Sequence, residues 1–160
     1  MKAEPQTEHA WLQQLVGEWE SEMTCSMGPD QPPFTTKGTE SVRSLGGLWT
    51  VGDGTGETPD GNACTTVMTL GFDPAKGRFV GTFVASMMSM IWHYEGALDA
   101  DGKTLTLETE GPSMSGDGSM SKYRDIVTIL SPDHRTLTSK MPGENGEWTE
   151  FMTAHYRRKA

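Results

Sequence analysis

The side chains best suited to acid–base chemistry in this sequence are one histidine and one glutamate on two predicted strands. His93 lies in the segment 91–98, and Glu40 lies in the segment 34–45. A histidine near a carboxylate can transfer protons at neutral pH, so a small enzyme could use His93 or Glu40. The inward apolar residues of 91–98 occupy even positions, which places His93 on the outer, solvated face. We therefore predict no catalytic residue and keep the acid–base enzyme as an alternative.

Glu40 differs from His93 because the face of its strand is apolar. Three inward positions share this face: Phe34, Gly38 and Val42. An inward carboxylate needs a partner or a raised pKa, and Arg124 on the predicted strand 119–130 is the candidate partner. We predict that Glu40 is a polar anchor in an otherwise apolar cavity. An exposed charge is the alternative interpretation.

The pattern of histidines and cysteines does not favour a metal or a nucleophile. The four histidines fall in different predicted elements or in a turn: His9, His93, His134 and His155. Cys25 and Cys64 lack the spacing of metal ligands, and the Gly-x-Ser-x-Gly motif of serine hydrolases is missing from the sequence. We expect no metal ion and no cofactor. Haem held by His93 or His155 is a weaker alternative.

Methionines and aromatic residues are the most suggestive apolar feature. Five of the eleven methionines gather near two predicted loops: Met87, Met88, Met90, Met114 and Met120. Methionine is flexible and polarizable and lines adaptable apolar sites, although it also fills core gaps and subunit contacts. We predict that a small, mostly apolar or aromatic ligand binds among these residues: Glu40, Trp49, Met68, Phe83, Trp92 and Tyr94.

Short strands are the elements that would position these side chains. Thr7 can cap a helix of about 8–16. Ten strands follow, at about 18–27, 34–45, from 48 onward, 62–72, 78–86, 91–98, 104–110, 119–130, 136–141 and 147–158. The glycine-rich segment 52–61 is predicted to be a flexible loop. A ten-stranded antiparallel meander removes its edges by closing, so the sequence predicts an all-β, up-and-down barrel with one short N-terminal helix.

Composition limits the domain organisation and the partners. We expect one barrel domain over residues 8–159, after a disordered N-terminus at 1–7. The formal net charge of −9 disfavours nucleic acid and anionic membranes as partners. The chain shows neither an apolar run near the ~20 residues of a membrane span nor the apolar core of a signal peptide. We therefore expect a cytoplasmic protein with reduced thiols.

The segment Leu15-Val16-Gly17-Glu18-Trp19 resembles the Gly-x-Trp signature on the first strand of calycins, the lipocalin and fatty-acid-binding barrels. Gly17 marks the change from helix to strand, and Trp19 would plug the closed end. In lipocalins an arginine from late in the barrel covers this ring. The resemblance therefore implies that Arg157 or Arg158 covers it here, and we assign Arg157. Because calycin-type barrels often self-associate, the resemblance also suggests a homodimer.

More closely, residues 8–159 resemble a small bacterial family of uncharacterised proteins, domain of unknown function 1579. Beyond the Leu-Val-Gly-x-Trp start, the shared pattern consists of Gly38-x-Glu40-x-x-Arg43, Leu70-Gly71-Phe72-Asp73-Pro74 with the strand 78–83, and the closing Tyr156-Arg157-Arg158-Lys159. The resemblance implies a calycin-like barrel and no established activity. The leading hypothesis is thus a binding barrel, with the acid–base enzyme and a filled structural barrel acting through oligomer contacts as alternatives.

Overall fold

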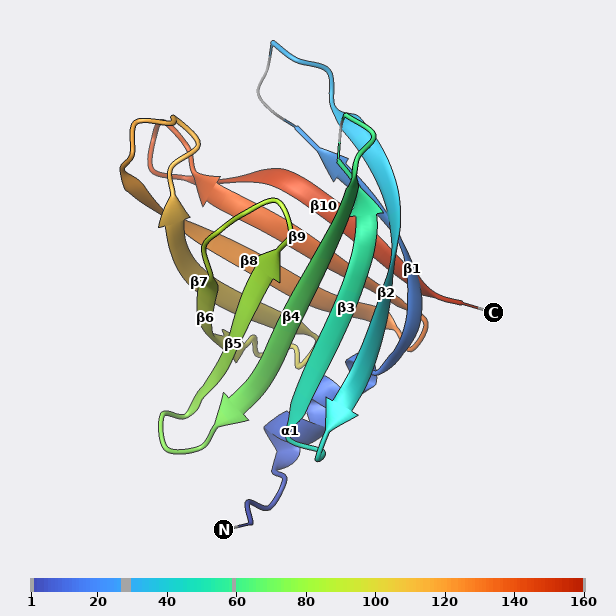
Figure 1. The fold of residues 1–160 in the computed structure, drawn as a ribbon. Helices are drawn as coiled ribbons and strands as arrows, with labels where there is room; N and C mark the ends of the chain where they lie inside the picture. Colours follow the sequence, from blue (N-terminus) through green and yellow to red (C-terminus); the bar gives the residue numbers. More distant parts are fainter. Residues whose placement is uncertain (1, 27–29, 59, 160) are drawn as a thin grey trace.

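The computed structural model describes residues 2–26, 30–58 and 60–159 (Figure 1). Within these residues, ten antiparallel strands close into a barrel in the order β1-β10-β9-β8-β7-β6-β5-β4-β3-β2. The elements are α1 (Thr7–Leu12), the 3-10 turn η1 (Gln13–Leu15), β1 (Gly17–Cys25), β2 (Phe34–Leu45), β3 (Trp49–Glu57), β4 (Ala63–Asp73), β5 (Arg78–Ala85), β6 (Trp92–Leu98), β7 (Thr104–Pro112), β8 (Met120–Ser131), β9 (His134–Pro142) and β10 (Trp148–Arg158). The predicted fold class is confirmed.

Helix α1 lies across one end of the barrel, which we call the closed end (Figure 1). Leu12 and Leu15 are almost fully buried there, because the helix turns its apolar stripe toward the strands. The cap differs from the prediction: Gln6 rather than Thr7 is the N-cap. The Gln6 backbone N–H donates to His9 Nδ1 at 2.8 Å, so His9 Nε2 is free to donate to the Phe72 carbonyl at 3.0 Å. This histidine therefore ties the helix to β4.

Trp19 fills the closed end from the first strand. Its exposed fraction is 1%, and its indole N–H donates to the Leu15 carbonyl at 2.9 Å. The guanidinium of Arg158 stacks on the ring, with its Cζ 4.2 Å from the centroid. The assignment of Arg157 to this role is wrong. The β1–β10 register places Arg158 opposite Trp19 on the inner face. Its neighbour Arg157 therefore points outward and is exposed.

Gly17 is required by both its backbone and its surroundings. Its φ of 138° lies in a region that side chains with a Cβ rarely adopt. A Cβ there would stand 2.2 Å from Nη1 of Arg158. The same Nη1 donates to the Val16 carbonyl, and Nη2 donates to the Gln14 carbonyl, both at 2.8 Å. The absent side chain thus leaves room for the arginine that joins the end of η1 to the last strand.

Most of the segment 52–61 is not the flexible loop that the glycines suggested, because β3 continues to Glu57. β3 pairs with β4 over its whole length and with β2 as far as Gly56. Residues 58, 60 and 61 belong to the connection between β3 and β4, and Pro59 lies outside the described residues. Gly52 and Gly54 are in a strand because the space on their inner face is crowded. A Cβ on Gly52 would lie 2.9 Å from Oε2 of Glu40, and one on Gly54 would lie 2.4 Å from Oγ1 of Thr66. Glycine occurs here because neighbouring side chains leave no room for a Cβ, although glycine has a low strand propensity.

The two ends of the barrel differ in packing. The buried cluster gathers toward the closed end: Leu12, Leu15, Trp19, Val42, Leu70, Phe79, Tyr94, Leu105, Leu107 and Val127. The opposite end, which we call the open end, carries the longer connections, such as those between β5 and β6 and between β7 and β8 (Figure 1). In the described part of the chain, the helices are too short to cross a membrane.

Candidate functional site

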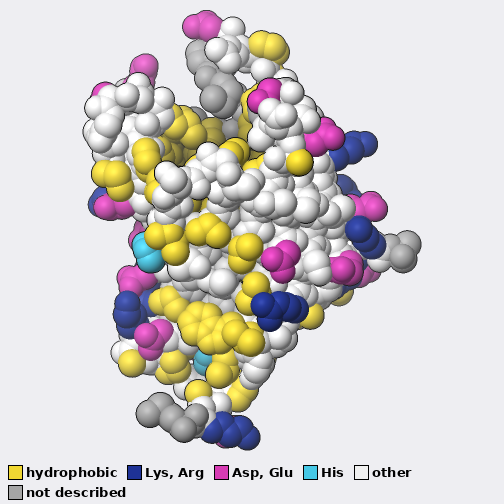
Figure 2. Space-filling model, in the orientation of Figure 1, with side chains coloured by type: hydrophobic (Ala, Val, Ile, Leu, Met, Phe, Trp, Pro, Cys, Tyr) yellow, Lys and Arg dark blue, Asp and Glu magenta, His cyan; other side chains and the backbone are white. Residues whose placement is uncertain are grey.

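A cavity of about 390 Å³ lies inside the barrel, above the buried cluster. Its aromatic lining consists of Phe83, Trp92, Tyr94, Tyr123, Phe151 and Tyr156. Its methionine lining consists of Met23, Met68, Met87, Met88, Met114 and Met152. A second hollow of about 280 Å³ shares Glu40, Thr66 and Phe83 with it, so the two are adjacent. Figure 2 shows hydrophobic side chains lining a depression between the loops of the open end.

Five of the six residues predicted to bind ligand line this cavity: Glu40, Met68, Phe83, Trp92 and Tyr94. Trp49 does not. It is 38% exposed on the outer face of β3, where its ring packs on Gly71. A Cβ on Gly71 would lie 2.3 Å from the Trp49 ring. Alternation explains the placement of Trp49, since the next residue, Thr50, is the one that points into the barrel.

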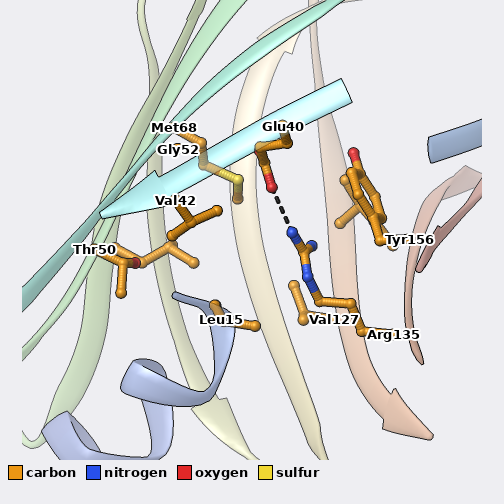
Figure 3. Close-up of a pocket in the computed structure, with 11 residues that line it drawn as sticks. Leu15, Glu40, Val42, Thr50, Gly52, Met68, Val127, Arg135 and Tyr156 are labelled. Atoms are coloured by element: carbon orange, nitrogen blue, oxygen red, sulfur yellow. Dashed lines mark hydrogen bonds and ion pairs between the residues drawn. The ribbon is translucent and has the colours of Figure 1, made fainter. Parts of the chain in front are cut away.

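An ion pair forms the floor of the cavity. Glu40 accepts a hydrogen bond from Nη2 of Arg135, and both side chains are largely buried (Figure 3). The Arg135 guanidinium lies between two rings, with Cζ 4.6 Å from the Trp19 centroid and 4.1 Å from that of Tyr156. The floor therefore has a paired negative charge, held in place by the plug of the closed end.

Arg124, the partner predicted for Glu40, lies on the outside of the barrel. There it pairs with Glu108 at 3.2 Å and stacks on Trp148 at 4.1 Å. On β8 the inward set is the odd-numbered one, so an even-numbered arginine faces solvent. Arg135 was missed because it was predicted to lie in the turn before the strand 136–141, and its contact with Glu40 spans 95 residues.

Tyr156 stands beside the ion pair. In Figure 3 its hydroxyl points away from Leu15 and the closed end. Burial, followed by the negative charge of Glu40, raises the pKa of this hydroxyl far above its usual value. The group therefore stays protonated at neutral pH and can donate a hydrogen bond into the cavity.

Asp125 forms a second polar cluster on the cavity wall. It accepts hydrogen bonds from the hydroxyl of Tyr94 and from Oγ of Ser139, the latter at 2.6 Å. Burial raises the pKa of Asp125, and the two hydrogen bonds offset part of that rise. Burial also raises the pKa of Tyr94, helped by the neighbouring carboxylate. Alternation on β8 shows two opposed sets of mixed polarity, which is why the sequence did not single out Asp125.

The histidines lie outside this cavity. His93 is exposed on the outer face of β6, as alternation indicated. The β9–β10 register brings together two histidines distant in sequence: Nε2 of His134 lies 2.9 Å from Nδ1 of His155. Burial, and the charge of Arg157 beside it, lower the pKa of His134. Among the described residues, no group of three His, Cys, Asp or Glu side chains could hold a metal ion.

The methionines near the two loops divide between two surfaces. Met87, Met88 and Met114 line the cavity. Met90 and Met120 lie in a shallow outer hollow that also includes Ile91. The side chains at the open end are unusually exposed for their type, at 64% for Met87 and 53% for Met114. Flexible apolar side chains thus surround the entrance.

Comparison with known families matches residues 4–158 to the model described as "Protein of unknown function (DUF1579)". The chain belongs to this family. A comparison of this DUF1579 chain with curated proteins found no match.

Solved structures share the barrel of this DUF1579 chain at low sequence identity. Rv2717c from M. tuberculosis is 15% identical, with a TM-score of 0.64 over 98% of this chain and 100% of that one. The S-type phycobiliprotein lyase CPES from Guillardia theta is 12% identical, with a TM-score of 0.58 over 98% and 99%. EF1p2_mFAP2b, bound to DFHBI, is 15% identical, with a TM-score of 0.51 over 94% and 98%. At these identities the likeness establishes a shared fold.

Proposed function

We propose that this DUF1579 barrel binds a small, mostly apolar or aromatic molecule in its cavity, with Glu40, Met68, Phe83, Trp92 and Tyr94 among the contacts. The observation that supports this most is the cavity itself. Its volume of about 390 Å³ and its aromatic and methionine lining are typical of small-molecule sites. A structural neighbour of the same fold, EF1p2_mFAP2b, holds the small molecule DFHBI.

The arrangement of polar groups also supports binding. A site for an apolar ligand carries a few polar groups at fixed positions, which orient the ligand and select it. In this barrel such groups lie at two levels, with Glu40 and Tyr156 at the floor and Asp125 on the wall. The remaining lining is mostly apolar, so a bound molecule gains contact area from most of its surface.

The acid–base alternative has weaker support. His93 lies outside the barrel, so it could not act on a molecule in the cavity. Glu40 accepts a hydrogen bond from Arg135, so its carboxylate is already engaged by a protein side chain.

The alternative of a filled structural barrel has one observation in its favour. Ile91 and Met120 are exposed on the outer face, at 48% and 63%, and could contribute to a homodimer contact. If the barrel binds no ligand, substitutions to larger inward side chains should stabilise it, because they would fill the cavity.

The test is native mass spectrometry of protein purified from its own host, followed by thermal unfolding with a panel of lipids, haem and small aromatics. A retained mass, or a midpoint that rises with ligand concentration, is the expected result. Thr66→Phe, which fills the cavity from β4, should abolish the rise. Thr65→Phe, on the exposed face of the same strand, should preserve it. An apo mass with no midpoint shift for any compound would favour the filled barrel.

A further inference from the structure

Of the two acidic groups among the described residues that line the cavity, Asp125 is the one whose charge meets no cation. None of the ion pairs between described residues includes it. Its two hydrogen bonds come from the neutral hydroxyls of Tyr94 and Ser139. A carboxylate enclosed by protein is costly to keep ionised unless a positive charge lies near it. The cavity wall therefore carries a carboxylate that a cation from a ligand could pair with.

Glu40 shows how the same barrel treats a carboxylate whose charge is already balanced by the protein. Its charge is matched by Arg135, which is itself stacked between Trp19 and Tyr156. By contrast, the described lining of the cavity includes no lysine or arginine that could reach Asp125. Asp125, which has no such cation beside it, lines the cavity directly.

Aromatic rings that line the same cavity as Asp125 are suited to a positive charge. Trp92, Tyr123 and Phe151 form a chain of edge-to-face contacts, with centroids 5.5 Å and 6.1 Å apart. The Trp92 ring lies over Gly111, where a Cβ would come within 2.0 Å of it, so only glycine leaves room for the ring there. Aromatic faces attract ammonium and other cations, most strongly where water is excluded. The rings and the carboxylate therefore both favour a positively charged ligand in the cavity.

We propose that the molecule held in this cavity is an apolar or aromatic cation, whose amine or ammonium group pairs with Asp125 while its apolar body lies among the rings and methionines. This inference rests on the proposed binding function and deepens it by naming the class of ligand. Tyr94 and Ser139 occupy one acceptor position on each carboxylate oxygen, so each oxygen keeps a further position for an N–H donor. The net charge of −9 also favours the approach of a cation.

Three probes of nearly equal shape test the charge of the ligand: 4-phenylbutylamine, 4-phenylbutan-1-ol and 4-phenylbutanoate, which are cationic, neutral and anionic at pH 7. Isothermal titration calorimetry of the whole chain with each gives three affinities. We expect the amine to bind about tenfold or more tightly than the alcohol, and the carboxylate to bind most weakly, because a cation at Asp125 completes an ion pair.

Asp125→Asn assigns that preference to one residue. Asparagine keeps the size of the side chain and an acceptor for a hydroxyl, but it removes the charge. The amine-to-alcohol ratio should fall about tenfold in this variant, while the affinity for the alcohol stays within about threefold. Asp53→Asn is the matched control, since it removes the same charge from an exposed position on β3 and should leave the ratio unchanged.

The outcomes separate the two proposals. An alcohol that binds wild-type protein as tightly as the amine, or more tightly, would overturn the cationic ligand while leaving the binding barrel in place. Failure of all three probes to bind would count against the binding function itself and against this inference with it. The wild-type comparison decides the charge of the ligand even if Asp125→Asn fails to fold.

Discussion

The closed and open halves of this barrel use the same strands for opposite purposes. In the closed half, Trp19, Leu12 and Leu105 are buried almost completely, and Arg158 gives its N–H groups to backbone carbonyls. In the open half, Met87 and Met114 are exposed, and Asp125 lacks a cation. The difference suggests that stability is concentrated at one end and adaptability at the other, with Glu40 and Arg135 at the boundary.

The largest effect expected from a single substitution is at the centre of the closed half. Trp19→Ala removes a fully buried ring that contacts two guanidinium groups, so the free energy of unfolding should fall by about 4 kcal/mol. Trp92→Ala, in the open half, should cost about half as much, because one side of that ring borders the cavity. Urea unfolding followed by circular dichroism measures both. Equal losses would show that the two halves are equally packed.

The boundary between the halves should be nearly as sensitive. Glu40→Gln leaves the buried guanidinium of Arg135 without a counter-charge, and we expect it to lower the free energy of unfolding by about 3 kcal/mol. The double variant Glu40→Gln with Arg135→Met removes both charges and should recover much of that loss. A double variant less stable than the single one would contradict this account of the floor.

Two glycines provide a sharper contrast between the ends. Gly17→Ala should cost about 2 kcal/mol, because φ is positive and the new Cβ would displace Arg158. Gly56→Ala, on β3 toward the open end, should change the free energy of unfolding by less than about 0.5 kcal/mol. There the nearest atom to a new Cβ, the Lys37 carbonyl oxygen, is 3.8 Å away. Similar losses in urea unfolding would mean that the tight fit at Gly17 is unimportant.

Asp125 in the open half should also make the free energy of unfolding depend on pH. Because burial raises the pKa of Asp125, the folded chain holds that proton more tightly than the unfolded chain does. The resulting stability is fully present below the unfolded pKa of about 4 and is lost as pH rises through the folded pKa. Asp125→Asn should therefore gain stability relative to wild type as the pH rises above about 4. A relative loss over this range in urea unfolding would show that the ionised carboxylate is the favoured form.

The smallest effect on stability is expected at the entrance. Met114→Ala should change the free energy of unfolding by less than about 0.5 kcal/mol, since more than half of this side chain is exposed. It should nevertheless weaken the binding of 4-phenylbutylamine severalfold, because Met114 lines the cavity. Met120→Ala, also more than half exposed but on the outer surface, should leave that affinity unchanged. Equal affinities for the two variants would exclude Met114 from the site.

The sequence predicts the walls of this barrel better than its interior. Alternation correctly placed Glu40 inside and His93 outside, since each depends on its own strand alone. Arg135, by contrast, reaches Glu40 across 95 residues, and only the register of distant strands decides that contact. The strand character of 52–57 was missed for the same reason, because Gly52 and Gly54 leave room for side chains on neighbouring strands.

The contacts of Arg158 join the two ends of the chain, which affects the order in which parts of the barrel can fold. It donates to the carbonyls of Val16 and Gln14, across 142 and 144 residues, and β10 closes the barrel against β1. All other neighbouring strands are joined by hairpins, which form early because their ends are close in sequence. A ribosome must therefore release nearly the whole chain before this seam can form. Until then the nascent sheet has two unpaired edges, which is the period in which we expect the protein to be most prone to aggregation.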